Sequence, residues 1–245
     1  MIEVRGLHKT FGAEEVLSGV DLQIATGETC VILGRSGGGK SVLLKHLIGL
    51  LQPTRGEVLV EGKNIADLPE RKLGEVRKKI GMLFQSGALF DSMNVAENIG
   101  FPLKEAGVRD LKEIADRVAE ALEMVDLAGE ESKMPENLSG GMRKRVGLAR
   151  TIVGRPACIL YDEPTTGLDP IASDSINHLI RRLQKRLRVT SVVVTHDMKT
   201  AYHTADRIAY LHEGRIYFHD TPEALRTSSD AVVQDFIEGR SGDSD

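Results

Sequence analysis

Residues 34–41 restrict the fold of this chain more than any other stretch, because their sequence GRSGGGKS fits the pattern GxxxxGK[ST]. The apolar run Cys30–Leu33 comes before them and predicts a strand, and Val42–Leu51 comes after them and predicts a helix. A strand, a glycine-rich turn and a helix in this order predict a phosphate-binding loop. The chain is therefore expected to bind ATP or GTP.

The predicted loop would bind phosphates mainly through its backbone. Its glycines allow a tight turn that brings N–H groups against phosphate oxygens, and the following helix adds the positive end of its dipole. Lys40 would supply a positive charge and Ser41 a hydroxyl ligand for Mg²⁺. The alternative is a glycine-rich turn with an incidental lysine, which the neighbouring strand and helix disfavour. The residues expected to bind the nucleotide here are Gly34, Arg35, Ser36, Gly37, Gly38, Gly39, Lys40, Ser41 and Val42.

A second apolar run, Ile159–Tyr161, ends at two adjacent carboxylates, Asp162 and Glu163. Beside a phosphate loop, Asp162 would help to hold Mg²⁺, and Glu163 would take a proton from the attacking water. Taken alone, the pair fits the solvated end of a strand equally well, and the phosphate loop favours the catalytic interpretation. The pair therefore predicts that the bound nucleotide is hydrolysed.

The composition restricts the partners of the chain. Its 245 residues, 41% of them hydrophobic, can bury a full core in one domain or in one domain with an inserted lobe. The 32 basic and 36 acidic residues give a formal net charge of −4, so no basic field predicts nucleic acid binding. The basic run Arg143–Arg145 is expected to be a solvated helix face beside the nucleotide.

Cysteine use and hydropathy restrict the environment of the chain. Cys30 and Cys158 lie in buried-strand patterns, which favours free thiols in a reducing cytoplasm over a disulfide or a metal site. No apolar run approaches the length of about 18 residues that a membrane span needs. The chain begins directly with a strand pattern, so we expect neither a membrane span nor a signal peptide.

Strand and helix patterns alternate after about residue 30, which predicts an α/β fold with a mostly parallel sheet. Before that point, turn signals predict a small sheet of short strands around the base of the nucleotide. The clearest helix is expected at 110–127, where apolar residues recur at helical spacing after Asp110 and Glu113, a variant of the capping box.

The patterns also predict subdomains within one domain spanning residues 1–245. Residues 1–86 and 155–220 would form the nucleotide-binding core with its β subdomain, and residues 87–154 an inserted helical subdomain. Residues 221–245 would contain two short helices, from Pro222 and around 231–237, and a polar tail from Gly239 that is expected to fray.

The order of the motifs identifies a family resemblance. The phosphate loop is followed by Gln85, the stretch LSGGM at 138–142, the pair Asp162–Glu163, the stretch GLD at 167–169 and His196. In this order the chain resembles ABC-type ATPase subunits over residues 1–225. The resemblance implies a P-loop NTPase with a mostly parallel sheet, an N-terminal antiparallel β subdomain and an inserted α-helical subdomain.

The resemblance implies that the chain works as a homodimer. In this family the stretch at 138–142 faces the phosphate loop of the opposite subunit, so Ser139, Gly140 and Gly141 would contact the γ-phosphate in trans. They lie at the start of a helix running through Ala149, where an anion is favoured. Two copies would close around ATP and Mg²⁺.

The resemblance also implies roles for single residues. Gln85 would sense Mg²⁺ and the attacking water, Asp169 would couple the two sites, His196 would hydrogen-bond the γ-phosphate and Phe11 would stack on adenine. Considered singly, Phe11 is packed core about as often as a stacking platform, and His196 is more simply a satisfied strand-end histidine. The joint order and spacing of the motifs support these roles.

Three residues depart from the family pattern. Val42 replaces a hydroxyl that usually follows Ser41, Met142 stands where glutamine commonly closes the signature stretch, and Phe11 replaces a tyrosine. None of these changes removes a charge or a metal ligand. We therefore expect them to tune the activity and not to abolish it.

The rest of the sequence favours a transporter ATPase over other members of the family. Chromosome and repair ATPases need long heptad arms between the motif halves, and no sustained heptads separate Gln85 from Asp162. Ribosome-acting members fuse two such domains and carry basic linkers, whereas this chain has one domain and a slight excess of acidic residues.

The stretches FQSGALFDSMNV, LSGGMRKR and YDEPTTGLDPI closely resemble the ATPases of the Mla (maintenance of lipid asymmetry) phospholipid transporters and their relatives that work with Mce-domain proteins. The resemblance implies permease subunits contacted through Ser86–Phe90, accessory subunits including an Mce-domain protein, and a peripheral location on the cytoplasmic side of the bacterial inner membrane. The alternative is an ATPase of an importer for a polar solute such as an amino acid, which shares every nucleotide motif. For any one of the apolar residues Ala88, Leu89 and Phe90, packing in the core of the helical lobe is about as frequent as contact with a permease.

Overall fold

The computed structural model describes residues 1–240, which divide into two compact units. The first unit contains residues 1–67 and the residues from 194 onward, and the second contains residues 68–193. This division differs from the predicted subdomains, whose limits stay predictions. The polar tail, for which fraying is predicted, lies outside the described residues from Ser241 onward, so this prediction is not tested.

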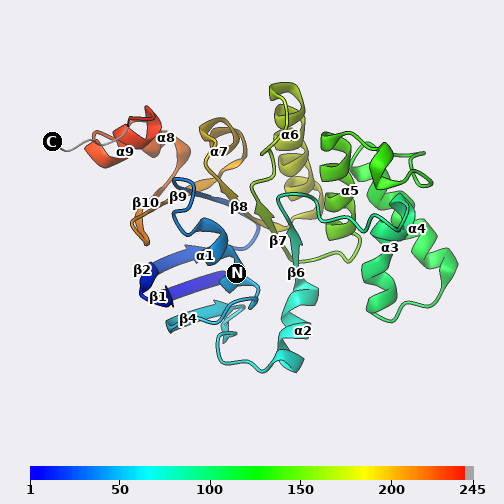
Figure 1. The fold of residues 1–245 in the computed structure, drawn as a ribbon, viewed down its shortest axis with the longest axis horizontal. Helices are drawn as coiled ribbons and strands as arrows, with labels where there is room; N and C mark the ends of the chain where they lie inside the picture. The colour runs from blue at the N-terminus through cyan, green and yellow to red at the C-terminus, as the bar shows by residue number, and fades with distance from the viewer. Residues whose placement is uncertain (241–245) are drawn as a thin grey trace. The chain divides into compact units, whose positions relative to one another are not determined.

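The first unit holds both ends of the described chain (Figure 1). Its strands and helices, in chain order, are β1 (Ile2–Phe11), β2 (Glu14–Ile24), β3 (Thr29–Leu33), α1 (Lys40–Leu47), β4 (Arg55–Val60), β5 (Lys63–Asn64), α7 (Met198–Thr204), β9 (Arg207–His212), β10 (Arg215–Asp220), α8 (Pro222–Arg226) and α9 (Ala231–Ile237). The first two strands are longer than the short strands predicted, and the helices α8 and α9 lie where they were predicted.

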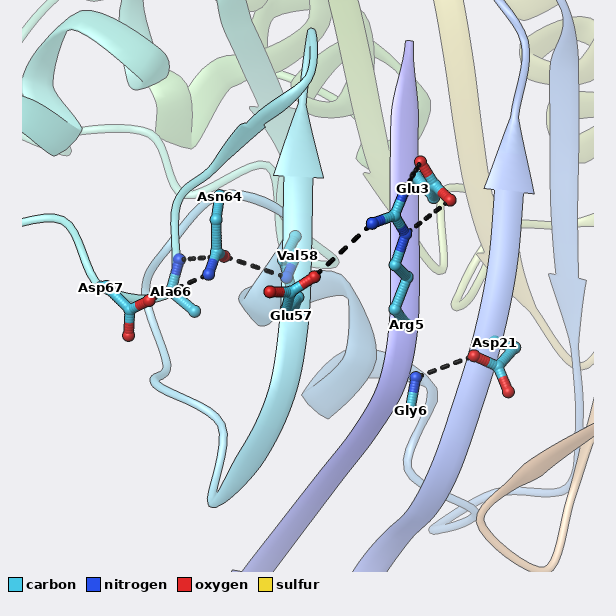
Figure 2. Close-up of polar contacts among 9 residues, drawn as sticks. All are labelled: Glu3, Arg5, Gly6, Asp21, Glu57, Val58, Asn64, Ala66 and Asp67. Atoms are coloured by element: carbon cyan, nitrogen blue, oxygen red, sulfur yellow. Dashed lines mark hydrogen bonds and ion pairs between the residues drawn. The ribbon is translucent and has the colours of Figure 1, made fainter.

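An antiparallel sheet in the order β2-β1-β4-β5 forms the start of the first unit. Successive side chains of β1 alternate between two faces, with Ile2 and Val4 almost fully buried and Arg5 exposed. Arg5 donates to both carboxylate oxygens of Glu3, at 2.7 and 3.0 Å, and lies 3.7 Å from Glu57 of β4 (Figure 2). The alternation places the core on one face of the sheet and solvated ion pairs on the other.

The regular pairing of β1 is interrupted around Gly6, where the register shifts against both neighbouring strands. The freed Gly6 N–H donates to Oδ1 of Asp21 on β2 at 2.8 Å (Figure 2). Gly56 of β4 lies against this bulge with a φ of 95°, and a Cβ there would lie only 2.2 Å from the carbonyl oxygen of Gly6. Only glycine fits that close approach of two backbones.

Strand β3, which leads to the phosphate loop, pairs in parallel with β9, and β9 pairs antiparallel with β10. Every residue of β3 is buried, as is usual for a strand inside a parallel sheet. Cys30 in β3 and Cys158 in the second unit are both free and buried, as predicted. Burial raises the pKa of the Cys158 thiol to about 12 and raises that of Cys30 further, so neither thiol is reactive near neutral pH.

The second unit contains the helices α2 to α6, from the middle of the chain (Figure 1). Its elements are α2 (Glu70–Lys79), β6 (Ile80–Leu83), α3 (Val95–Glu105), α4 (Leu111–Met124), the 3₁₀ turn η1 (Pro135–Asn137), α5 (Gly140–Ile152), β7 (Cys158–Asp162), α6 (Pro170–Leu187) and β8 (Thr190–Thr195), whose last two residues belong to the first unit. Strands β6 and β7 pair in parallel. The predicted α/β fold with a parallel sheet and an antiparallel N-terminal sheet is confirmed.

Two predicted helices end earlier than their apolar patterns suggested. The helix expected at 42–51 is α1, which ends at Leu47, and the helix expected at 110–127 is α4, which ends at Met124. Asp110 caps α4 by accepting the N–H groups of Lys112 and Glu113, at 2.8 and 3.3 Å. Among residues 1–240, no helix combines the length and the apolar character required to cross a membrane.

We predict that Gly56→Ala destabilises the protein more than Gly62→Ala does. Both glycines have positive φ, but a Cβ at Gly62 meets nothing within 4 Å, whereas a Cβ at Gly56 overlaps the backbone of Gly6. We expect losses in the free energy of unfolding of about 3 kcal/mol for Gly56→Ala and about 1 kcal/mol for Gly62→Ala. Urea unfolding of both variants tests this, and equal losses would contradict the close approach of the strands.

Candidate nucleotide site

The phosphate loop of the first unit leaves β3 at Gly34 and enters α1 at Lys40. Gly38 donates its N–H to the carbonyl oxygen of Arg35 at 3.1 Å, which closes the turn. The side chains of Arg35 and Ser36 are exposed at the tip, and the Arg35 guanidinium reaches the carbonyl of Arg240 at 3.5 Å. The turn therefore leaves its outer backbone open to a ligand.

The glycines of this loop are required by geometry. Gly37 and Gly39 have φ angles of 78° and 89°, and Gly39 is the left-handed residue that begins α1. A Cβ on Gly34 would lie 2.7 Å from the carbonyl oxygen of Leu211 in β9. The first turn of α1 contains no acidic residue, so its positive end is available to an anion.

Lys40 is 5% exposed, and its ammonium bends back onto the loop that precedes it. Its Nζ donates to the carbonyl oxygens of Gly34 and Arg35, at 3.0 Å each. These bonds hold the positive charge within the loop, where the phosphates of a nucleotide are expected. Ser41 and Val42 follow in α1 and are half-buried.

Phe11 and His196, the other predicted site residues of the first unit, lie at strand ends. Phe11 ends β1 and is 45% exposed, so the core-packing alternative is wrong for this residue. The Lys9 ammonium lies 4.9 Å from the centre of its ring. His196 follows β8 directly and is exposed, and Asp197 caps α7 behind it by accepting two N–H groups.

In the second unit, Asp162 ends β7 and Glu163 follows it, with exposed fractions of 8% and 9%. Glu163 adopts the left-handed conformation, with a φ of 48°, which is uncommon for a residue other than glycine. Oγ1 of Thr166 donates to Oε2 of Glu163 at 3.1 Å, and the Thr166 N–H donates to the Glu163 carbonyl at 3.3 Å. The turn therefore holds both the backbone carbonyl and the carboxylate of Glu163.

The signature stretch forms the start of α5. Ser139 is the N-cap, and its Oγ accepts the N–H of Met142 at 3.3 Å. Ser139 and Gly140 are exposed, Gly141 is half-buried, and the first turn of α5 contains no acidic residue. No acidic side chain in this turn would repel an anion, and the predicted contact with a γ-phosphate stays a prediction.

Asp169 is exposed and caps α6, where its Oδ1 accepts the N–H groups of Ile171 and Ala172 at 2.9 Å each. Its carboxylate therefore has a structural role within its own chain. Ile171, at the start of the same helix, is 84% exposed. The predicted coupling role of Asp169 across a dimer remains a prediction.

The prediction that Arg143–Arg145 is one solvated face is wrong. Arg143 is exposed, but Lys144 is only 5% exposed and Arg145 is held by Asp126 and Ser175, at 2.8 and 2.6 Å. Successive residues of a helix are rotated by about 100°, so three of them cannot share one face. Lys144 lies on the side of α5 that carries the buried residues Gly147 and Leu148.

The segment after Gln85 is a loop fixed from within the second unit. Gln85 is exposed, Phe84 and Phe90 are 39% and 42% exposed, and Ala88 has a φ of 47°. The ring of Phe90 packs on that of Phe101, with centroids 4.9 Å apart. Phe90 therefore combines a helical-lobe contact with an exposed apolar surface.

Asn98 of α3 anchors this loop and was not predicted. It is fully buried, its Oδ1 accepts the Phe90 N–H at 2.8 Å, and its Nδ2 donates to the carbonyl of Phe90 at 3.1 Å and to that of Met93 at 2.9 Å. The capping box of Asn94 and Glu97 fixes the start of the same helix. The sequence signal was a lone asparagine within the apolar face of a helix.

The structure thus divides the predicted residues between the two units. The first unit holds Phe11, the phosphate loop and His196. The second unit holds Gln85, Ser139, Gly140, Gly141, Asp162, Glu163 and Asp169. Within the second unit, Gln85 and Glu163 come together because both accept hydrogen bonds from Lys144.

Comparison with known protein families supports the nucleotide site. The family model for ABC transporters matches residues 17–166. The chain belongs to the ABC transporter family. It is 44% identical over 239 residues to the probable ribonucleotide transport ATP-binding protein mkl of Mycobacterium leprae, covering 98% of this chain and 69% of that protein. It is 41% identical over 241 residues to MlaF, the ATP-binding protein of an intermembrane phospholipid transport system in Haemophilus influenzae, covering 98% and 91%.

A solved structure agrees on the fold of this ABC ATPase. The ATP-binding cassette MJ0796, determined as a dimer in a post-hydrolysis state with ADP and Pi, aligns with a TM-score of 0.83 and 33% identity, over 91% of this chain and 99% of that one. The chain is therefore an ATP-binding and ATP-hydrolysing subunit of an ABC transporter.

We predict that Asn98→Leu destabilises the protein and loosens the loop from Gln85 to Phe90. The leucine fills a similar volume but removes the hydrogen bonds that fully buried Asn98 makes with the part-buried N–H and C=O of Phe90. Leaving buried polar groups unpaired costs about 2 kcal/mol in the free energy of unfolding. Urea unfolding gives the cost, and hydrogen exchange of the Phe90 amide shows the loosening. An unchanged exchange rate at Phe90 would contradict the anchoring role.

Proposed function

We propose that two copies of this chain close around ATP and thereby power the movement of a phospholipid, or another hydrophobic molecule, between the inner membrane and the cell envelope. The observation that carries the lipid part is the similarity to MlaF, which extends over 98% of this chain and 91% of that phospholipid-transport protein. The amino-acid sequence of the loop from Phe84 to Val95, which resembles that of the Mla ATPases, supports the same assignment. The chain would lie peripherally on the cytoplasmic side of the membrane.

In the proposed site, the backbone of residues 34–41 and the start of α1 bind the phosphates, and Lys40 neutralises part of their charge. Phe11 offers the exposed face of its ring to adenine. Glu163 takes a proton from the attacking water, and Gln85 and His196 orient the water and the γ-phosphate. The roles of Phe11, Gln85 and His196 rest on the order of motifs that the chain shares with ABC-type ATPases.

The proposed Mg²⁺ ligands are the hydroxyl of Ser41, the amide of Gln85 and the carboxylate of Asp162. They are all oxygen donors, which suits a hard cation that keeps several of its waters. Asp162 ends a buried strand and Ser41 lies in the first turn of α1, so both donors are on rigid elements. The ion would shield the phosphate charge.

The second copy would complete the site with the start of its α5. This helix start presents backbone N–H groups and a hydroxyl, from Ser139, Gly140 and Gly141. Because its first turn contains no carboxylate, the arrangement attracts an anion. The dimeric state of the cassette MJ0796 with ADP and Pi supports this pairing. Closure of the dimer on ATP and opening after hydrolysis would drive the transport cycle.

The membrane subunits would dock on the segment Ser86–Phe90. Its exposed apolar side chain Phe90 and its neighbour Phe84 offer a partner helix an apolar contact. An Mce-domain protein and other accessory subunits would complete the transporter. One observation supports the alternative function, an importer of a polar solute: the mkl protein is named as a probable ribonucleotide transport protein.

We predict that Glu163→Gln abolishes ATP turnover but still allows ATP to bind, because the amide keeps the shape of the side chain and cannot accept the proton. The variant should accumulate as a closed, ATP-bound dimer, visible by gel filtration with ATP. Lys40→Ala is the comparison, since it should lose ATP binding itself. Normal turnover in Glu163→Gln would refute the proposed base.

We predict that Phe90→Asp leaves ATP binding by the isolated chain unchanged but separates the chain from its membrane subunits. The carboxylate would have to be desolvated in an apolar contact. Co-purification from membranes measures the association, and Asp91→Asn, a charge change at the exposed neighbouring residue, is the control. Normal association of Phe90→Asp would contradict the docking surface.

The identity of the transported molecule can be tested with the Glu163→Gln chain purified together with its partners from native membranes. Mass spectrometry of the proteins and extracted lipids should find a polytopic permease, an Mce-domain protein and enriched phospholipid. A permease with a soluble solute-binding protein, without lipid enrichment, would favour the polar-solute alternative.

A further inference from the structure

Lys144 is a buried cation in the first half of α5, and its ammonium reaches two loops of the second unit. Its Nζ donates to the carbonyl oxygen of Gln85 and to that of Glu163, the latter at 3.4 Å. The side chain is 5% exposed. One ammonium group therefore links Gln85, which directly precedes the proposed docking segment Ser86–Phe90 (the docking loop), to the main chain of the proposed catalytic base.

Glu163 needs such support because of its backbone conformation. Its φ of 48° places it in the left-handed region, which costs a residue other than glycine about 1 kcal/mol. Strained conformations of this kind persist only where several contacts determine them. The Glu163 carbonyl receives hydrogen bonds from Lys144 and from the Thr166 N–H, and its carboxylate receives one from Thr166 Oγ1.

Burying an ammonium is costly, and an apolar side chain of similar length would fill the same space at lower cost. Burial lowers the pKa of Lys144, while the carboxylates of Asp162 and Glu163 act in the opposite direction. The buried charge thus lies beside the two acids of the site. Packing alone does not account for a lysine at this position.

We propose that Lys144 is a positioning residue for ATP hydrolysis, which holds the main chain of Gln85 and Glu163 in the relative placement that hydrolysis requires. This inference rests on the proposed role of Glu163 as the base. It also provides a link between the docking loop and the base, since a shift of Gln85 would be passed to Glu163 through one side chain.

The test compares Lys144→Met with Lys112→Met in the full chain assembled with its partners. Lys112 is exposed on α4, outside the site, and serves as the matched control. Because misplaced catalytic groups cost up to about 100-fold, we expect kcat to fall at least about tenfold in Lys144→Met, with KM and ATP affinity within about twofold of wild type. The thermal midpoint is measured beside kcat, because a positioning role predicts a loss of kcat at temperatures where the variant is still folded.

Rescue distinguishes positioning from packing. Lys144→Arg keeps the charge and several donors and should recover more of kcat than Lys144→Gln, which keeps donors without the charge. If Lys144→Met does not fold, the comparison of Lys144→Arg with Lys144→Gln tests the proposal. Equal kcat values in these two variants would overturn it. A kcat of Lys144→Met within twofold of wild type, or a loss of kcat that follows a loss of stability and of ATP affinity, would also overturn it.

Glu163→Gln separates this inference from the proposed function. If Glu163→Gln retains turnover, the base assignment fails and the positioning role fails with it. If Glu163→Gln is inactive and Lys144→Met is normal, the base assignment stands and only the role of Lys144 is wrong.

Discussion

The structure depends on one electrostatic requirement: main-chain N–H groups have to approach a polyanion closely, without side chains in the way. The loop at residues 34–41 meets it with left-handed glycines and with Gly34 pressed against the carbonyl of Leu211 in β9. The loop can hold this shape because β3, which leads to it, is buried along its whole length. The stability of the strand thus makes the open backbone of the loop possible.

The same requirement recurs at the start of α5, where Ser139 caps a helix whose first turn carries no carboxylate. A γ-phosphate bound between two helix starts would be stabilised from both sides. In the proposed dimer the two helix starts come from different copies, so the nucleotide itself becomes part of the interface. In the proposed site, Glu163, which is ordered by Thr166 and Lys144, would act as a base next to the same phosphate.

The sequence predicted the parts of the fold that local chemistry determines. The apolar run before the glycine-rich loop and the apolar run before Asp162 each predict a strand, and both strands are confirmed. The ends of α1 and α4 were placed too late, because apolar residues continue past each helix into the turn that follows.

Tertiary contacts determine what the sequence could not show. Asn98 looked like any polar residue in a helix, and its role depends on the loop carbonyls that the fold places beside it. The basic run Arg143–Arg145 predicts a solvated Lys144, and the structure buries it on the same side of α5 as Leu148, four residues later. Its contacts with Gln85 and Glu163 join segments that are far apart in the chain.

The central claim, a nucleotide site completed by a second copy, is tested most directly by mixing two inactive variants, Lys40→Ala and Ser139→Arg. Each alone should lack ATPase activity, but in a mixed dimer the intact phosphate loop of one chain faces the intact signature of the other. Random mixing should therefore restore about one quarter of the wild-type activity, since half of the dimers are mixed and each has one intact site. If both variants bind their partners and the mixture stays inactive, the site is not shared between copies.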